Sequence, residues 1–440
     1  MTPDYDGRKV AYFTLGCKLN FAETSTIGRM LRERGYRRVE PFEVPDMCVI
    51  NTCSVTETAD KKGRSLIRRL VNKWPDATIV VTGCYAQLKP AEVSGIEGVD
   101  IVLGSNEKLR LTEYLDRWEA EHRVIVDTTP SLDIRSFRPS CERGDRTRWW
   151  LKVQDGCDYF CTYCTIPFAR GRSRSGDIDS LVSQARDAEA GGAREIVLTG
   201  VNIGEFGRDN GQDFLTLLKR LDEVEGIARY RISSIEPNLL TDEILEWIAT
   251  ESRAFKHHFH IPLQSGSDHV LRLMNRRYDT ALFRHKVERI RQLMADAFIG
   301  VDVIAGARGE TAEEWEKSRE FIQSLDVTRL HVFPYSERPG TKALLLGDIV
   351  ENGERHRRVS VLTAVSDDKV RDFMRRSVGQ VRDVLWEHRV NGTDMMSGLT
   401  DNYLRVIAPY REGAVNTIST VRIVDMDSDR AETVLGQHID

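Results

Sequence analysis

Residues 157–164 read Cys157-Asp-Tyr-Phe-Cys161-Thr-Tyr-Cys164, so three cysteines stand within eight positions of a 440-residue chain. Thiols spaced this closely are typical of metal or cluster ligation. A structural zinc site takes four ligands, and no fourth cysteine or histidine stands near this segment. Three thiolates on an iron–sulfur cluster instead leave one iron open to a further ligand. The spacing therefore predicts an open iron–sulfur site, with an open zinc site or three incidental cysteines as the alternatives.

Three more cysteines lie near the N-terminus, and each follows a short apolar run that we expect to be a β-strand. Helix-like segments follow each of them, so strands and helices alternate. The carboxyl ends of parallel strands meet at one edge of a sheet, which predicts that these three thiols form a second site. Burial of each cysteine as a small apolar residue is the alternative. The pairs are residues 10–15 with Cys17, residues 47–50 with Cys53, and residues 78–81 with Cys84.

The composition is that of a globular protein of about three domains. The hydrophobic fraction is 40% and the charged fraction 30%, which excludes a disordered chain and a disulfide-rich miniprotein. The net charge of −5 gives no general affinity for nucleic acid, so RNA contacts require a local patch. No apolar run approaches the roughly 20 residues of a membrane span. We expect a cytoplasmic protein without membrane contact.

The predicted fold class is α/β. Residues 1–130 are expected to form a Rossmann-like α/β domain, residues 131–148 a linker, residues 149–375 a partial (β/α)6 barrel, and residues 376–440 a small antiparallel β-barrel. The candidate strands of the central domain are residues 150–153, 195–199, 230–235, 258–261, 300–304 and 329–332; those of the last are residues 383–389, 403–408, 417–424 and 431–436.

The Cys-x3-Cys-x2-Cys spacing resembles the radical S-adenosylmethionine (SAM) signature. Together with three spaced N-terminal cysteines, it is similar to the radical SAM methylthiotransferase family over nearly the whole chain. One branch of that family acts on threonylcarbamoyladenosine at tRNA position 37, and four motifs resemble it. They are Gly16-Cys-Lys-Leu-Asn20, Ala59-Asp-Lys-Lys62, Arg231-Ile-Ser-Ser-Ile-Glu-Pro237 and His258-Phe-His-Ile-Pro-Leu-Gln-Ser-Gly-Ser267. The branches acting on isopentenyladenosine in tRNA and on a ribosomal-protein aspartate are the rival substrates.

The resemblance implies two [4Fe-4S] clusters, held by Cys17, Cys53 and Cys84 and by Cys157, Cys161 and Cys164, which are also the predicted catalytic residues. It implies SAM as radical source and methyl donor, the anticodon loop of tRNA as substrate, an electron donor and a sulfur source. The C-terminal barrel then corresponds to an RNA-binding TRAM domain. Here that segment, residues 377–440, carries six arginines, no lysine and ten acidic residues. A non-catalytic iron–sulfur RNA-binding protein and a structural zinc protein are the alternatives of another class.

SAM contacts follow from the same resemblance. An aromatic residue before the last cysteine of the triplet lies against the adenine, and polar residues at strand ends hold the rest. One motif departs from the family, since Gly306-Ala-Arg-Gly-Glu-Thr311 stands where Gly-Phe-Pro-Gly-Glu-Thr is usual. A basic helix is also predicted over residues 59–74, where it faces tRNA phosphates or simply water. The predicted SAM contacts are Tyr163, Arg174, Glu195, Ser234, Glu236 and Gln264.

Overall fold

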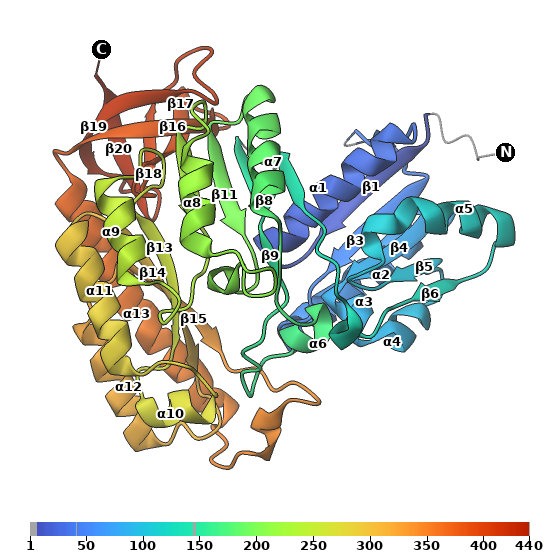
Figure 1. The fold of residues 1–440 in the computed structure, drawn as a ribbon, viewed down its shortest axis with the longest axis horizontal. Coiled ribbons are helices and arrows are strands. Elements are labelled where there is room, and N and C mark those ends of the chain that lie inside the picture. The colour runs from blue at the N-terminus through green and yellow to red at the C-terminus, as the bar shows by residue number, and fades with distance from the viewer. Residues whose placement is uncertain (1–6, 41, 144–146, 440) are drawn as a thin grey trace.

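The structure is a computed structural model that describes residues 7–40, 42–143 and 147–439 (Figure 1). Its N-terminal part is a parallel sheet with the strand order β2-β1-β3-β4-β5-β6. Side chains alternate along each strand, so Val10 packs under α1 and α5 while Ala11 packs under α2 and α3. The strands are β1 (Lys9–Thr14), β2 (Arg37–Arg38), β3 (Met47–Thr52), β4 (Thr78–Gly83), β5 (Ile101–Leu103) and β6 (Ile125–Asp127); the helices are α1 (Lys18–Glu33), α2 (Glu57–Lys73), α3 (Cys84–Leu88), α4 (Pro90–Ser94) and α5 (Leu111–Glu121).

The central part contains all six predicted parallel strands. They form two sheets, β12-β11-β8-β7 and β13-β14-β15, which an isolated parallel bridge between Ser234 and His260 joins into a partial barrel. The segment predicted as a linker, residues 131–148, is not all loop, because β7 (Ser140–Arg143) pairs antiparallel with β8; residues 144–146 of that segment lie outside the described residues. The parallel strands are β8 (Arg148–Lys152), β11 (Glu195–Thr199), β12 (Arg229–Ile232), β13 (His258–Gln264), β14 (Phe298–Ala305) and β15 (Arg329–Pro334).

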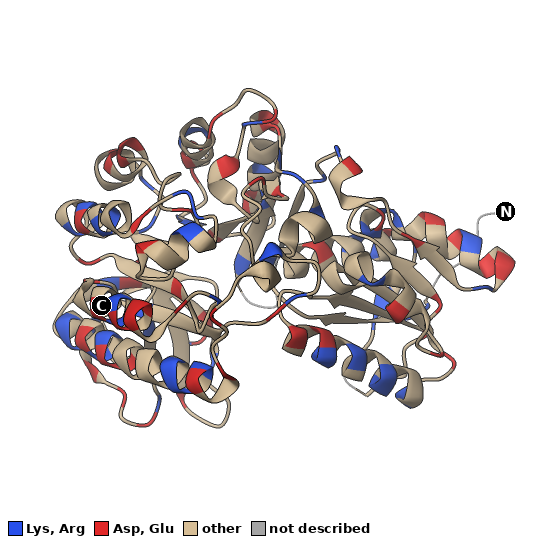
Figure 2. Ribbon diagram, turned by 90° about the horizontal axis from the view of Figure 1, so that it is seen from below, with Lys and Arg blue, Asp and Glu red and all other residues tan. Residues whose placement is uncertain are grey.

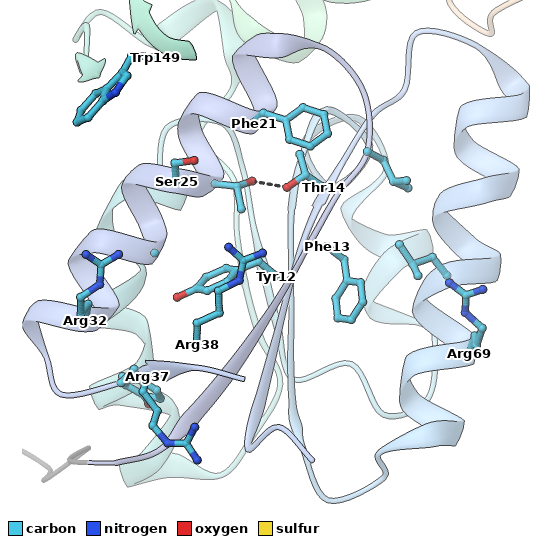
Figure 3. Close-up of a pocket in the computed structure, with 15 residues that line it drawn as sticks. Tyr12, Phe13, Thr14, Phe21, Ser25, Arg32, Arg37, Arg38, Arg69 and Trp149 are labelled. Atoms are coloured by element: carbon cyan, nitrogen blue, oxygen red, sulfur yellow. Dashed lines mark hydrogen bonds between the residues drawn. The ribbon is translucent and has the colours of Figure 1, made fainter. Parts of the chain in front are cut away.

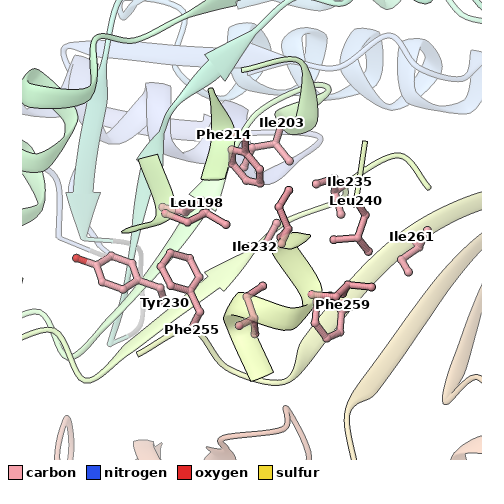
Figure 4. Close-up of a cluster of buried hydrophobic side chains, with 14 of the residues drawn as sticks. Leu198, Ile203, Phe214, Tyr230, Ile232, Ile235, Leu240, Phe255, Phe259 and Ile261 are labelled. Atoms are coloured by element: carbon pink, nitrogen blue, oxygen red, sulfur yellow. The ribbon is translucent and has the colours of Figure 1, made fainter. Parts of the chain in front are cut away.

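Helices cover the outside of this partial barrel, and capping residues fix where most of them begin. An aspartate or threonine precedes each of α7, α8, α9, α11 and α12 and accepts a hydrogen bond from a backbone N–H of the first turn. Such a cap contributes about 0.5–2 kcal/mol. Apolar side chains of strands and helices then form one continuous core, part of which Figure 4 shows around Ile232 and Phe259. The helices are α6 (Ile166–Arg170), α7 (Ile178–Ala190), α8 (Phe214–Asp222), α9 (Asp242–Thr250), α10 (Asp268–Leu273), α11 (Thr280–Leu293), α12 (Ala312–Ser324) and α13 (Asn352–Ser377); a short ribbon pairs β9 (Gln154–Asp155) with β10 (Arg174–Ser175).

The C-terminal part is a closed five-stranded barrel with the order β16-β17-β18-β20-β19. It was expected to be antiparallel, but β18 and β20 pair in parallel. A closed ring with an odd number of strands cannot alternate direction throughout, so one parallel pair is unavoidable. Helix α13 packs Phe373 and Met374 into the barrel core. The helix continues without a break through residue 375, where the boundary between the two domains was predicted. That boundary therefore stays a prediction. The strands are β16 (Val381–Arg389), β17 (Met395–Thr400), β18 (Arg405–Pro409), β19 (Ile418–Met426) and β20 (Thr433–His438).

None of the helices in the described ranges is long and apolar enough to span a bilayer.

Candidate active site

The three N-terminal cysteines lie together at the carboxyl ends of β1, β3 and β4. Cys17 is the N-cap of α1, Cys53 follows β3, and Cys84 begins α3. Gly16 has φ +109°, and a Cβ at this position would lie 3.1 Å from the Cys53 Sγ. A side chain at residue 16 would therefore collide with the neighbouring thiol, which explains why a glycine precedes Cys17. Burial, followed by the charges of Cys84 and Cys17, raises the pKa of Cys53 to about 11.

The backbone around these thiols is held by amide side chains. Asn20 Nδ2 donates to the carbonyl oxygens of Leu15 (2.8 Å) and Thr52 (3.1 Å), which ties the ends of β1 and β3 together. Gly83, with φ +94°, approaches β3 so closely that a Cβ would lie 2.3 Å from the Thr52 carbonyl oxygen. Close packing of the strand ends thus fixes the spacing between the three thiols.

The second set of cysteines lies on the loop between β9 and α6. Cys157 Sγ accepts from the Tyr159 backbone N–H (3.4 Å) and from Asn202 Nδ2 (3.8 Å). Cys164 Sγ accepts from the backbone N–H of Ile166 at 3.4 Å. Donors directed at sulfur suit thiolates better than thiols, because they stabilise the negative charge.

Cys161 has a cationic partner that the sequence analysis missed. Arg276 Nη1 donates to the Cys161 Sγ at 3.2 Å, Arg276 Nε donates to the Tyr278 hydroxyl at 2.9 Å, and Arg276 Nη2 pairs with the Glu236 carboxylate. Arg276 lies 115 residues beyond Cys161, and no spacing pattern in the chain links the two. Asn202 was missed for the same reason.

Burial opposes ionisation of the triplet and raises the pKa of Cys164 to about 12. Thiolates at this site therefore need a bound positive charge such as iron. Within the described ranges, no group of three or more His, Cys, Asp or Glu side chains is close enough to hold a single metal ion. A [4Fe-4S] cluster makes no such demand, since its thiolates bind separate irons. The residues present thus fit a cluster: three cysteines on one loop, with N–H donors on their sulfurs.

Four of the predicted SAM contacts lie at the same end of the barrel as the triplet. Tyr163 packs in an apolar cluster with Ala307 and Tyr335. Ser234 and Glu236 follow β12, and the Glu236 carboxylate reaches the triplet through Arg276. Gln264 ends β13 beside a bulge, with φ +65°.

In the unusual Gly306–Thr311 motif, Gly306 and Gly309 both have positive φ, a conformation that favours glycine at these two positions. Ala307 packs in the apolar cluster of Tyr163. Arg308 donates to the carbonyl oxygens of Leu344 (2.9 Å) and Leu346 (3.0 Å). The replacement of Phe-Pro thus gives this loop a cation that anchors the neighbouring segment.

The structure does not support the predicted contact of Glu195 with SAM. Glu195 begins β11, at the end of the strand opposite the triplet, and its carboxylate accepts from Arg231 Nε at 2.9 Å. Arg231 also donates to the carbonyl oxygens of Thr400 and Asp401, both at 2.8 Å. Glu195 therefore fastens the C-terminal barrel to the central sheet, and strand direction keeps it away from SAM.

The predicted contact of Arg174 with SAM is likewise not supported. The Arg174 guanidinium donates to the carbonyl oxygens of Arg170 (2.8 Å), Arg172 (2.7 Å) and Ser136 (3.2 Å), and it lies 3.4 Å from the Asp155 carboxylate. These partners occupy the guanidinium, so Arg174 supports the loop that carries the triplet and is not free to bind the carboxylate of SAM.

Comparison with known proteins identifies the family. Residues 9–104 match the model of the uncharacterized protein family UPF0004, and residues 151–322 match that of the radical SAM superfamily. The chain is 40% identical over 428 residues to the threonylcarbamoyladenosine tRNA methylthiotransferase MtaB of Bacillus subtilis, covering 94% of this chain and 93% of the relative. This chain belongs to the radical SAM methylthiotransferase family.

The chain is also similar to a second class of tRNA methylthiotransferase and to a solved radical SAM enzyme. The tRNA-2-methylthio-N(6)-dimethylallyladenosine synthase of Cereibacter sphaeroides is 31% identical over 426 residues, covering 95% of this chain and 96% of the relative. The solved radical S-adenosylmethionine methyltransferase TsrM from Kitasatospora setae superposes with a TM-score of 0.58 at 14% identity, covering 77% of each chain. The second likeness concerns the fold alone.

In this methylthiotransferase, a buried charge network joins the two cysteine-bearing parts. The Glu23 carboxylate of α1 is fully buried and accepts from Lys108 Nζ (2.5 Å), Lys152 Nζ (3.0 Å) and Arg170 Nη2 (3.0 Å). Asp155 accepts from Lys152 and Arg170. Cations from the central barrel thus meet an anion of the N-terminal sheet domain next to Cys84, whose pKa burial raises and Arg170 lowers.

A cavity of about 950 Å³ lies over β1 of the methylthiotransferase (Figure 3). Residues of β1, α1, β2 and α2 line it, and Phe21 and Trp149 lie at the end of the groove opposite Arg37. Aromatic rings and arginines share this groove, which is a combination suited to RNA. Its arginines are Arg32, Arg37, Arg38 and Arg69.

Proposed function

We propose that this enzyme adds a methylthio group to C2 of threonylcarbamoyladenosine at position 37 of tRNA, in the cytoplasm. One observation carries the proposal: the 40% identity to the Bacillus subtilis threonylcarbamoyladenosine tRNA methylthiotransferase runs along 94% of a chain that has both sets of three cysteines. Identity to the dimethylallyladenosine synthase is lower, at 31%.

The chemistry requires both cysteine sets. Cys157, Cys161 and Cys164 would hold a [4Fe-4S] cluster, which would accept an electron from a donor and supply the reducing power for SAM cleavage, a chemistry that acid–base side chains cannot provide. Tyr163, Ser234, Glu236 and Gln264 hold SAM at the barrel rim. Cys17, Cys53 and Cys84 would hold a second [4Fe-4S] cluster, which would present the sulfur obtained from a sulfur source.

The residues around the triplet orient its thiolates and exclude water. Asn202 and Arg276 direct N–H groups at the Cys157 and Cys161 sulfurs. Arg276 also pairs with the Glu236 carboxylate, whose pKa is raised by burial, and so links the barrel rim to the loop that carries the triplet.

Local basic surfaces provide the attraction for tRNA. Positive and negative residues are interspersed over the ribbon in Figure 2, consistent with the net charge of −5. The predicted basic helix is present as α2, whose Lys61, Lys62, Arg68 and Arg69 are exposed. Each phosphate contact releases counterions, so binding that depends on these residues weakens steeply with salt. Arg69 also lines the groove in Figure 3.

Mass spectrometry of tRNA nucleosides from cells with and without the gene tests the proposal. We expect loss of the methylthio form of threonylcarbamoyladenosine alone. Loss of the methylthio form of isopentenyladenosine instead would move the substrate and keep the chemistry. If both nucleosides are unchanged, the substrate assignment is wrong, and the ribosomal-protein aspartate and a non-catalytic RNA-binding role come next.

Cysteine variants of the purified enzyme test whether one cysteine set serves SAM cleavage and the other serves sulfur transfer. Cys161→Ala is expected to abolish formation of 5′-deoxyadenosine after anaerobic reduction. Cys17→Ala is expected to preserve that cleavage and stop methylthiolation. Normal methylthiolated product from either variant would contradict the assignment.

A further inference from the structure

A second cavity, of about 440 Å³, lies inside the partial barrel, between β13, β14, β15 and the C-terminal barrel. This volume is within the roughly 300–1,000 Å³ of small-molecule sites. Its lining includes His258 and His260 of β13, His331 of β15, Tyr403 of the C-terminal barrel, and Lys18 of α1. The cavity is thus built by all three parts of the molecule.

The polar groups of this cavity are prearranged. His260 Nε2 lies 2.7 Å from the Asp302 Oδ1, and the His260 and His331 rings stack with centroids 5.0 Å apart. The His258 ring stacks on Tyr403 at 4.0 Å. The buried Nδ1 of His258 has no hydrogen-bond partner among the described residues. Burial, and then His260, lower the pKa of His331 to about 4, so this ring is neutral at pH 7.

Lys18 is the cation of the cavity that lacks an anionic partner. Arg329 pairs with Glu432 at 2.5 Å, and Arg405 lies 3.4 Å from Glu387. Lys18 has no ion pair or side-chain hydrogen bond with any residue in the part of the chain that the structure describes. A half-buried ammonium group that faces a cavity without a counter-ion is suited to bind an anion.

The cavity adjoins the N-terminal cysteine set and continues down the barrel to the beginnings of β13, β14 and β15. Lys18 directly follows Cys17, and Ser234, a predicted SAM contact, bridges to His260. Asp302 is close enough to Glu236 to add to the rise in pKa that burial causes there. An N6 substituent that extends into the barrel from a base held beside Cys17 would therefore enter this cavity.

We propose that this cavity binds the threonylcarbamoyl substituent of the target adenosine, and that Lys18 Nζ pairs with its threonine carboxylate. The assignment rests on the proposed function and deepens it. The substituent carries a carboxylate, a hydroxyl and a urea group, which match one ammonium group and the imidazole nitrogens of the cavity. An uncharged dimethylallyl group would bury Lys18 without a counter-ion, so the same residue selects against that substrate.

The test uses the enzyme reconstituted with iron and sulfide and three RNA stem-loops that differ only at N6 of adenosine 37. One carries threonylcarbamoyl, one its threonine carboxamide, and one no substituent. Dissociation constants are measured for the wild type, Lys18→Met and Lys18→Arg, after iron content is shown to be equal. Lys62→Met on the exposed face of α2 is the matched control.

We expect the wild type to prefer the threonylcarbamoyl RNA over the other two. Lys18→Met should reduce this preference about 10- to 150-fold, the value of one charged hydrogen bond, and Lys18→Arg should retain most of it. Lys62→Met should leave the preference unchanged, since a phosphate contact weakens all three RNAs alike. Should Lys18→Met fail to bind iron, equal wild-type affinity for the carboxamide and the carboxylate would overturn the inference.

The inference is also overturned if Lys18→Met keeps the wild-type preference or weakens all three RNAs equally. Turnover separates this failure from that of the proposed function. A wild type that methylthiolates the threonylcarbamoyl RNA while the Lys18 variants show no change refutes only the role of Lys18. Turnover is also measured with a fourth stem-loop that carries dimethylallyladenosine; a wild type that modifies this RNA and leaves the threonylcarbamoyl RNA unmodified refutes both.

Discussion

Replacement of Glu23 by glutamine tests the energetics of the contact between the two cysteine-bearing parts. Glu23 is fully buried and accepts hydrogen bonds from Lys108, Lys152 and Arg170. Glu23→Gln keeps the shape and removes the charge, which leaves Lys152 and Arg170 with Asp155 and removes the one carboxylate with which Lys108 pairs among the described residues. Removing one partner from a buried ion pair costs about 3–5 kcal/mol, because the other charge stays buried and unpaired.

Hydrogen exchange of the α1 backbone amides measures this cost locally, without assuming that a chain of several domains unfolds in one step. A loss of about 3–5 kcal/mol corresponds to exchange that is about 150- to 5,000-fold faster. Glu33→Gln is the matched control, since Glu33 lies on the same helix and pairs with Arg29 at 3.1 Å with its side chain 62% exposed. An exposed pair contributes less than about 1 kcal/mol. Equal acceleration by both substitutions would refute the reasoning.

The same network predicts a pH dependence. Burial raises the pKa of Glu23, but Arg170, Lys108 and Lys152 outweigh it and hold this pKa below the usual 4.5. A carboxylate whose pKa is lower in the folded state stabilises the fold fully above its unfolded pKa of about 4.3, and the contribution is lost as the pH falls toward the folded value. The wild type should therefore lose α1 protection below about pH 4.5. In Glu23→Gln, the protection of α1 against hydrogen exchange should no longer fall with the protonation of this side chain. A pH profile identical to that of the wild type below pH 4.5 would contradict the role of Glu23.

Two further substitutions test the cysteine sites. Arg276→Met removes the cationic donor to the Cys161 sulfur. The reduction potential of the triplet cluster should become more negative by about 60–130 mV, the equivalent of one charged hydrogen bond in a one-electron couple, as measured by a redox titration followed by electron paramagnetic resonance. Arg277 donates to the Asp158 carbonyl instead, so an equally large shift in Arg277→Met would argue against the sulfur contact. Gly83→Ala should reduce the iron content of the reconstituted protein by about half, to one cluster, because the added Cβ would lie 2.3 Å from the Thr52 carbonyl oxygen and push β3 and β4 apart. Gly353→Ala, which has open space around it, is the control and should retain the full iron content. Full iron content in the Gly83 variant would contradict the prediction.

The local pattern of the chain was enough to predict most secondary structure. Six parallel strands of the partial barrel and the strands before Cys17, Cys53 and Cys84 are where their apolar runs predicted them. These elements depend on neighbouring residues, whose period of two or 3.6 is visible in sequence. The linker over residues 131–148 stays a prediction; β7 within it was not predicted, because a strand that gains its hydrogen bonds from β8 depends on what lies alongside it in space.

By itself, the sequence determined the two sets of three cysteines and the helix–strand order, since both are local properties. Only the tertiary structure decided which charged groups meet. Arg276 reaches Cys161 across 115 residues, and Glu195 pairs with Arg231 at the far end of the barrel from the triplet. Lys18 is left without a counter-ion in a cavity shared by all three parts. A long charged side chain takes its partner from whatever packing brings within about 4 Å, and that distance is set by the fold rather than by position along the chain.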